Sequence, residues 1–179
     1  MNPFSYHDLP VSRWRNGGGE TREIISFPPG EVHFGWRASI ATISTDGAFS
    51  LFPGVDRVIT LLQGDAVRLN APGTEQRLTL HQPWAFPGEL ALKATLTGGT
   101  SLDFNIMTRR ASWLAAVQVL STAVSSEHGV AFVLSGEWRL AHGKILAPQQ
   151  GIWWVDEPVQ LTPLSQEAHL LFTRLSRVP

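Results

Sequence analysis

Short apolar runs, separated by glycine or proline about every eight to twelve residues, constrain the fold of this 179-residue chain more than any other feature. The runs are rich in valine, isoleucine, leucine, threonine and aromatic residues, and turn signals such as Pro53-Gly54 and Gly98-Gly99 lie between them. This pattern is typical of antiparallel sandwiches and barrels, so we predict an all-β protein in which helix is scarce. The clearest strands are expected at residues 21–27, 36–43, 58–62, 66–70, 90–96, 102–108, 129–134, 138–141, 152–155 and 170–175. Residues 110–120 mix helix formers with valines, and there we favour a strand.

One part of this pattern occurs twice. Residues 58–65 (Val-Ile-Thr-Leu-Leu-Gln-Gly-Asp) resemble residues 130–137 (Val-Ala-Phe-Val-Leu-Ser-Gly-Glu), which lie 72 positions later. A polar stretch, an aromatic pair and a closing strand follow each copy. The alternative is chance similarity, because apolar strands resemble each other easily. We predict two related β units, residues 1–109 and a smaller unit of residues 110–179, packed as one compact body.

The composition excludes several classes of function. The net charge is −1 and neither sign forms a long run, so we expect no nucleic-acid partner and no membrane partner. The absence of cysteine excludes disulfides, thiolate metal sites and a cysteine nucleophile. The first residues lack the basic and apolar segments of a signal peptide, and no run approaches the ~20 apolar residues of a membrane span. The expected location is therefore the cytoplasm.

Residues 14–22 (Trp-Arg-Asn-Gly-Gly-Gly-Glu-Thr-Arg) combine backbone freedom with polar groups more than any other segment. Three successive glycines allow positive φ angles and a close approach to a ligand. Backbone N–H groups in such a turn can converge on an anion, and a guanidinium matches a carboxylate or phosphate. The segment is therefore either half of a small-anion site or a glycine-rich connection into a strand. A nucleotide P-loop is disfavoured, because no Gly-Lys-Ser or Gly-Lys-Thr follows.

A second group of polar residues alternates with apolar ones along the expected strands. Because side chains alternate between the two faces of a strand, Asp103, Asn105 and Arg109 share one face of residues 102–109. Arg37 lies on a similar face of another expected strand. Such a face is either exposed to solvent or lines a polar cavity. If it is buried, Arg37 or Arg109 is expected to pair with Asp103.

Five blocks of the sequence, in this order, resemble the HutD/Ves family: residues 14–24, 36–40, 47–54, 61–64 and 103–109. The two-copy strand pattern is also similar to the cupin double-stranded barrel. The resemblance implies a bicupin, with two fused double-stranded β-helix (jelly-roll) barrels of the RmlC-like cupin superfamily. Through HutD it implies an association with bacterial histidine utilisation and a regulatory or metabolite-sensing role, and through Ves a stress response. Urocanate or formylglutamate is the kind of ligand that the resemblance suggests.

The residues for metal-dependent or nucleophilic chemistry are missing. Many cupins hold a divalent metal through a His-x-His pair, a glutamate and a third histidine. This chain has six histidines but no His-x-His pair, so we expect no metal and no other cofactor. No Gly-x-Ser-x-Gly nucleophile setting is present. If the protein is an enzyme, Glu20 and Glu23, which flank Thr21, are the candidate acid and base.

We therefore favour a non-enzymatic, metal-free protein that binds a small carboxylate in the first unit. The expected ligand-binding residues are Trp14, Arg15, Asn16, Gly17, Gly18, Gly19, Thr21, Arg37, Asp103, Asn105 and Arg109. One alternative is a metal-independent cupin enzyme of the isomerase or hydrolase type that acts on a small acid. The other is a protein-interaction module whose tryptophan-rich second unit forms a homodimer or partner surface.

Overall fold

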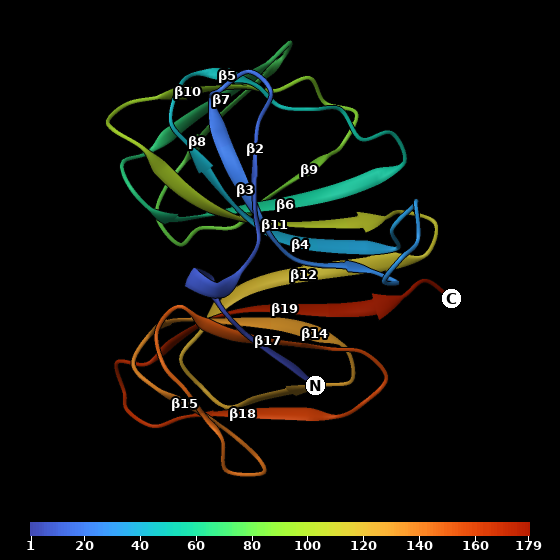
Figure 1. The fold of residues 1–179 in the computed structure, drawn as a ribbon, viewed down its shortest axis with the longest axis vertical. Coiled ribbons are helices and arrows are strands. Elements are labelled where there is room, and N and C mark those ends of the chain that lie inside the picture. Colours follow the sequence, from blue (N-terminus) through green and yellow to red (C-terminus); the bar gives the residue numbers. More distant parts are fainter. The chain divides into compact units, whose positions relative to one another are not determined.

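A computed structural model describes all 179 residues, and nearly all its regular structure consists of antiparallel strands. The chain forms two compact units (Figure 1). The first unit consists of Pro10–Leu114 with Val178, and the second unit consists of Met1–Leu9, Ala115–Arg177 and Pro179. The only helix is the three-residue 3-10 helix η1 (Tyr6–Asp8). None of the helical structure is long and apolar enough to cross a membrane.

The first unit contains two antiparallel sheets. The six-stranded sheet has the order β2 (Val11–Arg13), β3 (Gly19–Phe27), β4 (Trp36–Ile43), β11 (Ser101–Arg109), β6 (Val55–Gln63) and β9 (Trp84–Pro87). The four-stranded sheet has the order β5 (Gly47–Ala48), β10 (Lys93–Leu96), β7 (Val67–Ala71) and β8 (Thr74–Leu78).

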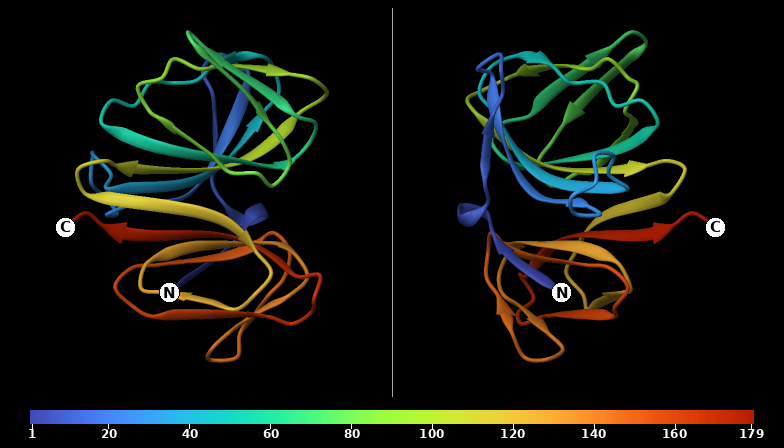
Figure 2. Two further views of the ribbon diagram at one scale, coloured as in Figure 1. Left: turned by 180° about the vertical axis from the view of Figure 1, so that it is seen from behind. Right: turned by 45° about the vertical axis from the view of Figure 1, so that its right-hand side comes forward.

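The second unit is built in the same way. Its five-stranded sheet has the order β1 (Asn2–Ser5), β17 (Gln150–Trp154), β14 (Gly129–Ser135), β19 (His169–Arg177) and β12 (Trp113–Leu120). Its four-stranded sheet has the order β13 (Val124–Ser126), β18 (Val159–Pro163), β15 (Trp138–Leu140) and β16 (Ile145–Leu146). Two further views show the strands of each unit curving around that unit's own interior (Figure 2).

The strand order confirms the internal repeat. The order β4-β11-β6-β9 in the first unit corresponds to β12-β19-β14-β17 in the second, and β5-β10-β7-β8 corresponds to β13-β18-β15-β16. Strands β6 and β14, which carry the two similar sequences, therefore occupy equivalent positions. Each is followed by a glycine with positive φ, Gly64 at 101° and Gly136 at 67°. Glycine adopts this conformation most readily, and a Cβ atom would also come within 2.9 Å of the Thr100 carbonyl oxygen at Gly64 and within 2.7 Å of Ala168 at Gly136, which explains why the repeated sequence has glycine there.

The unit boundaries differ from those predicted. Residues 1–9, expected in the first unit, lie in the second, because β1 pairs with β17. The boundary near the middle of the chain falls within β12 rather than between residues 109 and 110. A pairing between residues 2 and 153 leaves no local trace in the sequence, so the pattern of strands and turns could not predict it.

Most strand predictions are confirmed. The strand over residues 36–43 has its predicted bounds, and the ambiguous residues 110–120 form strand β12 from Trp113 to Leu120. The prediction for residues 90–96 begins too early, because Leu90 and Leu92 make turn hydrogen bonds before β10 starts at Lys93. The sequence pattern missed eight short strands, namely β1, β2, β5, β8, β9, β13, β16 and β18.

The interiors of the two units differ in polarity. Apolar side chains fill the second unit, including Trp138, Trp154 and Phe172. In the first unit, an apolar cluster around Ile59 and Leu61 occupies part of the interior. The remaining part contains a cavity lined by both polar and apolar residues.

Candidate functional site

The cavity of the first unit has a volume of about 540 Å³. It is formed by the β2–β3 hairpin, by strands β4, β6 and β11, and by the segment that follows β5. Its lining residues are Arg13, Trp14, Arg15, Asn16, Thr21, Arg37, Ser39, Ala41, Ile43, Ala48, Phe49, Ser50, Phe52, Arg57, Asp103, Asn105 and Met107. Cavities of this size hold small molecules.

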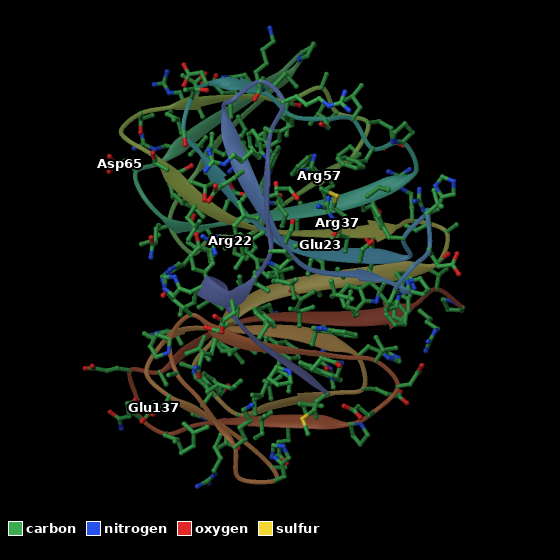
Figure 3. The ribbon with its side chains drawn as sticks, viewed as in Figure 1. Arg22, Glu23, Arg37, Arg57, Asp65 and Glu137 are labelled. Atoms are coloured by element: carbon green, nitrogen blue, oxygen red, sulfur yellow. The ribbon has the colours of Figure 1, made fainter.

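The register of β4, β11 and β6 explains which polar side chains meet. Met107 on β11 pairs with Arg37 on β4 and with Arg57 on β6, so the two arginines lie in one row across three strands. Two residues along the strand, Asn105 pairs with Ser39. Because alternate residues share a face, Asp103 also points to the cavity side. Figure 3 shows Arg37 and Arg57 near each other in the first unit.

Arg57 is buried, with 7% of its surface exposed. Its guanidinium lies over three aromatic rings, 4.9 Å from the centroid of Phe86, 5.3 Å from that of Phe52 and 5.5 Å from that of Phe49. It donates two long hydrogen bonds, from Nη1 to the Ser50 carbonyl oxygen at 3.4 Å and from Nη2 to Asn105 Oδ1 at 3.5 Å. Its Nε has no hydrogen-bond partner, and it forms no salt bridge.

The pKa of Arg57 is lowered to about 10, chiefly by burial, while the negative charge of Asp103 raises it and the positive charge of Arg37 lowers it. The guanidinium therefore remains a cation at neutral pH in surroundings that do not satisfy it fully.

Asp103 is the one carboxylate in the cavity wall, and 1% of its surface is exposed. Its Oδ1 accepts a hydrogen bond from Asn105 Nδ2, whereas its Oδ2 has no hydrogen-bond partner. Burial raises the pKa of this carboxyl to about 7, although the hydrogen bond from Asn105 and the charge of Arg57 both favour its ionised form. The ion pair expected between Asp103 and Arg37 or Arg109 is not formed.

Arg37 pairs with Glu23 instead. Arg37 Nε donates to Glu23 Oε1 at 2.9 Å, across the neighbouring strands β4 and β3. Glu20 neighbours Thr21, which lines the cavity, so its side chain points to the other face of β3. Neither of the two glutamates proposed as acid and base lines the cavity. Asp103 is the acidic group that does.

The glycine motif forms the tight β2–β3 hairpin. The Trp14 N–H donates to the Gly19 carbonyl at 2.9 Å, and the Gly17 N–H donates to the Trp14 carbonyl at 3.0 Å. The Gly18 N–H donates to the side chain of Asn16 at 2.8 Å. These N–H groups are therefore used within the hairpin, and none of the three glycines lines the cavity.

The role of Gly19 is to let Trp14 reach the cavity. A Cβ atom at Gly19 would overlap the carbonyl oxygen of Thr42 and would come within 2.9 Å of the Trp14 ring. Trp14 packs over the space left by the missing side chain, and its Nε1 donates to Thr21 Oγ1 at 2.8 Å. The hairpin thus places an indole and a hydroxyl in the cavity wall.

We expect Gly19→Ala to lower the free energy of unfolding by about 3 kcal/mol, because the added methyl group must displace the Thr42 backbone or the Trp14 ring. Gly17 also has a positive φ of 72°, but a Cβ there would contact nothing within 4 Å. Gly17→Ala should therefore cost only about 1 kcal/mol. Urea denaturation of both variants measures the difference, and equal losses would contradict the packing role of Gly19.

The structure brings together seven of the predicted site residues, namely Trp14, Arg15, Asn16, Thr21, Arg37, Asp103 and Asn105. It leaves out Gly17, Gly18, Gly19 and Arg109. Arg109 is the last residue of β11, where its Nε donates to the Phe34 carbonyl at 3.3 Å and its guanidinium lies over the Phe34 ring.

The sequence analysis missed Arg57, the most buried cation of the site. Arg57 alternates with Val55, Ile59 and Leu61, all of which are buried. An arginine on the apolar face of a strand was therefore the signal that could have found it. The aromatic residues Phe49 and Phe52 that surround it lie outside any regular strand, where no pattern marks them.

The second unit serves as an internal comparison. The register that pairs Arg57 with Phe86 in the first unit pairs Gly129 with Trp154 in the second. The apolar pairs of the second unit, Val133 with Leu170 and Ala131 with Phe172, correspond to pairs that contain Asp103 and Asn105 in the first. The same fold can thus fill these positions with apolar side chains, so the polar residues of the first unit are not required for packing.

The residues around the cavity do not fit a metal centre of the cupin type. No group of three or more histidine, cysteine, aspartate or glutamate side chains lies close enough to hold a metal ion. The cavity wall combines one carboxylate with four arginines and has no histidine. Such a set of donors suits an anion, because guanidinium groups pair with carboxylates and repel cations.

Comparisons with known proteins identify close relatives of this chain. The HutD family profile matches residues 6–172. Protein Ves from Citrobacter koseri is 47% identical over 184 residues, which cover all of this chain and 96% of that protein. Protein Ves from Escherichia fergusonii is 45% identical with the same coverage.

Solved structures show the same fold. HutD from Pseudomonas fluorescens SBW25, in a formate condition, matches with a TM-score of 0.86 at 27% identity, over 99% of this chain and 98% of that one. A conserved protein of unknown function from Pseudomonas aeruginosa PAO1 matches with a TM-score of 0.85 at 27% identity, over 97% of each chain. A cupin 2 conserved barrel domain protein from Leptotrichia buccalis, 8% identical, has a TM-score of 0.69 over 98% of this chain and 97% of that one. The chain therefore belongs to the HutD/Ves family and has a bicupin fold of antiparallel strands.

Proposed function

We propose that this protein binds a small carboxylate in the cavity of its first unit, without a metal or other cofactor. One observation carries this conclusion: Arg57 is buried in the cavity wall as a cation, with no salt bridge and with an unpartnered Nε. A buried cation without a counter-ion is costly. A carboxylate in the cavity would supply the missing charge.

The surrounding residues complete such a site. Arg57 and Arg37 present guanidinium groups from two strands that flank β11, and Asn105 adds an amide between them. Arg13, Arg15 and Asn16 are exposed on the hairpin at the same cavity, where positive charge attracts anions from solution. Trp14, Phe52 and Met107 provide apolar contact surface for the carbon skeleton of the ligand.

Family membership supports a biological setting. Because the HutD name is associated with histidine utilisation, we infer that the protein senses an acid of that pathway, such as urocanate or formylglutamate, and acts as a cytoplasmic regulator. The Ves relatives make a role in a stress response the alternative setting. The related HutD structure was obtained in a formate condition, which makes formate a useful minimal probe.

A thermal-shift panel tests carboxylate binding. The panel contains formate, glutarate, urocanate and formylglutamate, each with its uncharged amide as a control. A carboxylate at 100 times its dissociation constant should stabilise the protein by about 2.7 kcal/mol, whereas the amides should give no shift. A flat response to every acid would overturn the proposal. Stoichiometric metal in the purified protein by elemental analysis would overturn its metal-free part.

An enzyme is the second candidate, because an acidic group whose pKa is raised to about 7 lies in the cavity wall. A carboxyl with such a pKa can both donate and accept a proton near neutral pH. The group is Asp103 rather than Glu20 or Glu23. Formation of a product from a bound acid by the wild type, and its loss in Asp103→Asn, would favour this candidate.

A partner surface on the second unit is the third candidate, and Trp153 is the one tryptophan of that unit's β14–β19 region that is partly exposed. Trp138 and Trp154 are fully buried in the interior of that unit. They cannot contact a partner or a second copy of the chain without unfolding the unit.

A further inference from the structure

We propose that Asp103 selects, among small carboxylates, those that also carry an N–H hydrogen-bond donor close to the carboxylate, as amino acids, amido acids and imidazole acids do. This inference rests on the proposed function and names the class of ligand. It derives from the one carboxylate that lies among the arginines of the cavity.

The hydrogen bonds of the site run in one direction. Arg57 Nη2 donates to Asn105 Oδ1, and Asn105 Nδ2 donates to Asp103 Oδ1. Asp103 thus ends a chain of donors, and its second oxygen, Oδ2, is buried without a partner. A buried acceptor without a partner costs about 1 to 3 kcal/mol. A ligand with an N–H group can remove this cost.

Charge balance leads to the same ligand class. A carboxylate bound at Arg57 while Asp103 is ionised would place two negative charges beside one buried cation. The binding of a simple acid must then be accompanied by protonation of Asp103. A ligand that also brings an N–H donor, above all a cationic one, leaves the carboxyl ionised and satisfied.

The distances favour a compact ligand. Residues two apart on a strand lie about 7 Å apart, and Asp103 and Asn105 are such neighbours. The Arg57 side chain reaches Asn105. A ligand that bridges the two charged groups therefore spans about one such repeat, which is the size of an amino acid.

Two matched pairs of acids test this selection. L-Glutamate differs from glutarate by one amino group, and urocanate differs from 3-(2-furyl)acrylate by an N–H-bearing ring in place of an oxygen-bearing one. Isothermal titration at pH 7.5 should show that the donor-bearing member of at least one pair binds about tenfold or more tightly.

Variants assign the preference to Asp103. In Asp103→Asn the two acids of each pair should bind about equally. Glutarate should bind more tightly than it does to the wild type, because the negative charge of Asp103 no longer repels it. Asp103→Leu, which copies Leu170 of the second unit, should do the same and guards against misfolding of the first variant. Asp65→Asn removes an exposed carboxylate that lies away from the cavity and should keep the wild-type preference (Figure 3).

The pH dependence distinguishes the two kinds of ligand. The charged group that acts on Asp103 is Arg57 from β6, and Arg37 from β4, with its partner Glu23 from β3, lines the same cavity farther along β11. The hairpin adds Arg13 and Arg15, and no histidine lines the cavity. Between pH 6 and pH 8, L-glutamate should bind more tightly and glutarate more weakly as Asp103 ionises.

The outcomes separate this inference from the proposed function. Equal affinities within each pair that are unchanged in Asp103→Asn would overturn the inference and leave carboxylate binding intact. No binding by any acid, including those of the thermal-shift panel, would overturn both. Loss of the preference in Asp65→Asn as well would show that Asp103 is not its source.

Discussion

Arg57→Met abolishes carboxylate binding and leaves the first unit folded. Methionine keeps the unbranched stem of the side chain and can pack against Phe49, Phe52 and Phe86, which now surround the guanidinium. The cation and its free hydrogen-bond donors are lost. Because removing one partner of a buried charged contact costs about 2 to 5 kcal/mol, we expect affinity for the tightest acid of the panel to fall at least ~100-fold.

Stability should change little in this variant at pH 6. Arg57 makes only two hydrogen bonds, at 3.4 and 3.5 Å, and no salt bridge, so its removal breaks no strong hydrogen bond or ion pair, and methionine replaces its contacts with the aromatic rings. Without the guanidinium nearby, Asp103 is more readily protonated and stays neutral at this pH. The melting temperature should therefore remain within a few degrees of the wild-type value.

Arg109→Met is the matched control. Arg109 also lies over an aromatic ring, with its guanidinium 5.2 Å from the Phe34 centroid, but it does not line the cavity. Isothermal titration should give wild-type affinity for this variant. If Arg57→Met bound the acid within threefold of the wild type, or if Arg109→Met lost binding equally, the cavity would not be the carboxylate site.

The sequence predicted the two faces of β11 but could not decide what covers the polar one. Alternation separates Asp103 and Asn105 from Phe104 and Ile106 in the same way for a strand that faces solvent and for one that lines a cavity. In the structure every residue from Ser101 to Thr108 is buried. Burial of both faces depends on strands distant in the chain, and the local pattern carries no information about them.

The glycine motif lies in the hairpin beside the cavity, but its N–H groups do not have the anion-binding role that was predicted for them. Whether a glycine N–H is free for a ligand depends on whether the hairpin itself uses it, and here Gly17 and Gly18 donate within the hairpin. Conversely, Arg57 was overlooked because it stands alone on an apolar face, where no motif surrounds it. A single charged residue on the buried face of a strand was therefore a better indicator of the cavity wall than a run of three glycines.

The repeat was visible in β6 and β14 because both strands end in an apolar pair, a polar residue and a glycine with positive φ. The sequence similarity between the two units is weaker elsewhere, and the reason is physical. The second unit fills its interior with Leu170 and Phe172, whereas the first unit has Asp103 and Asn105 in its cavity wall at the equivalent positions. The sequence differences between the two units are therefore concentrated at the interior positions, which are apolar in the filled second unit and polar around the cavity of the first.

Asp103→Leu should stabilise the protein, and the gain should grow with pH. The pKa of Asp103 is raised to about 7 in the folded protein, compared with about 3.9 for an unperturbed aspartate. At pH values between these two pKa values, Asp103 is protonated in the folded state and ionised in the unfolded state. The free energy of unfolding of the wild type therefore falls as pH rises from about 4 to about 7. Above pH 7 the accumulated loss is about 4 kcal/mol.

Leucine removes this loss, because it has no charge to bury and because its counterpart Leu170 packs at the equivalent position of the second unit. The variant and the wild type should therefore have similar free energies of unfolding near pH 4 and should differ by about 4 kcal/mol near pH 8. The surface ion pair of Glu89 is present in both proteins, so its effect cancels in the difference between them. Its hydrogen bonds from Arg110 lower the pKa of Glu89 to about 2, so its stabilisation is lost only below about pH 4.3.

Urea denaturation of wild type, Asp103→Leu and Asp65→Asn across pH 4 to 8 measures these curves. Asp65→Asn controls for the loss of one carboxylate and should follow the wild-type slope. A difference between Asp103→Leu and wild type that stayed constant over this range would mean that Asp103 ionises as readily in the folded state as in the unfolded one. Taken together with Arg57→Met, the expected result describes a site maintained at a cost to stability. The polar interior that weakens the unit at neutral pH is the same interior that a bound carboxylate with an N–H group would satisfy.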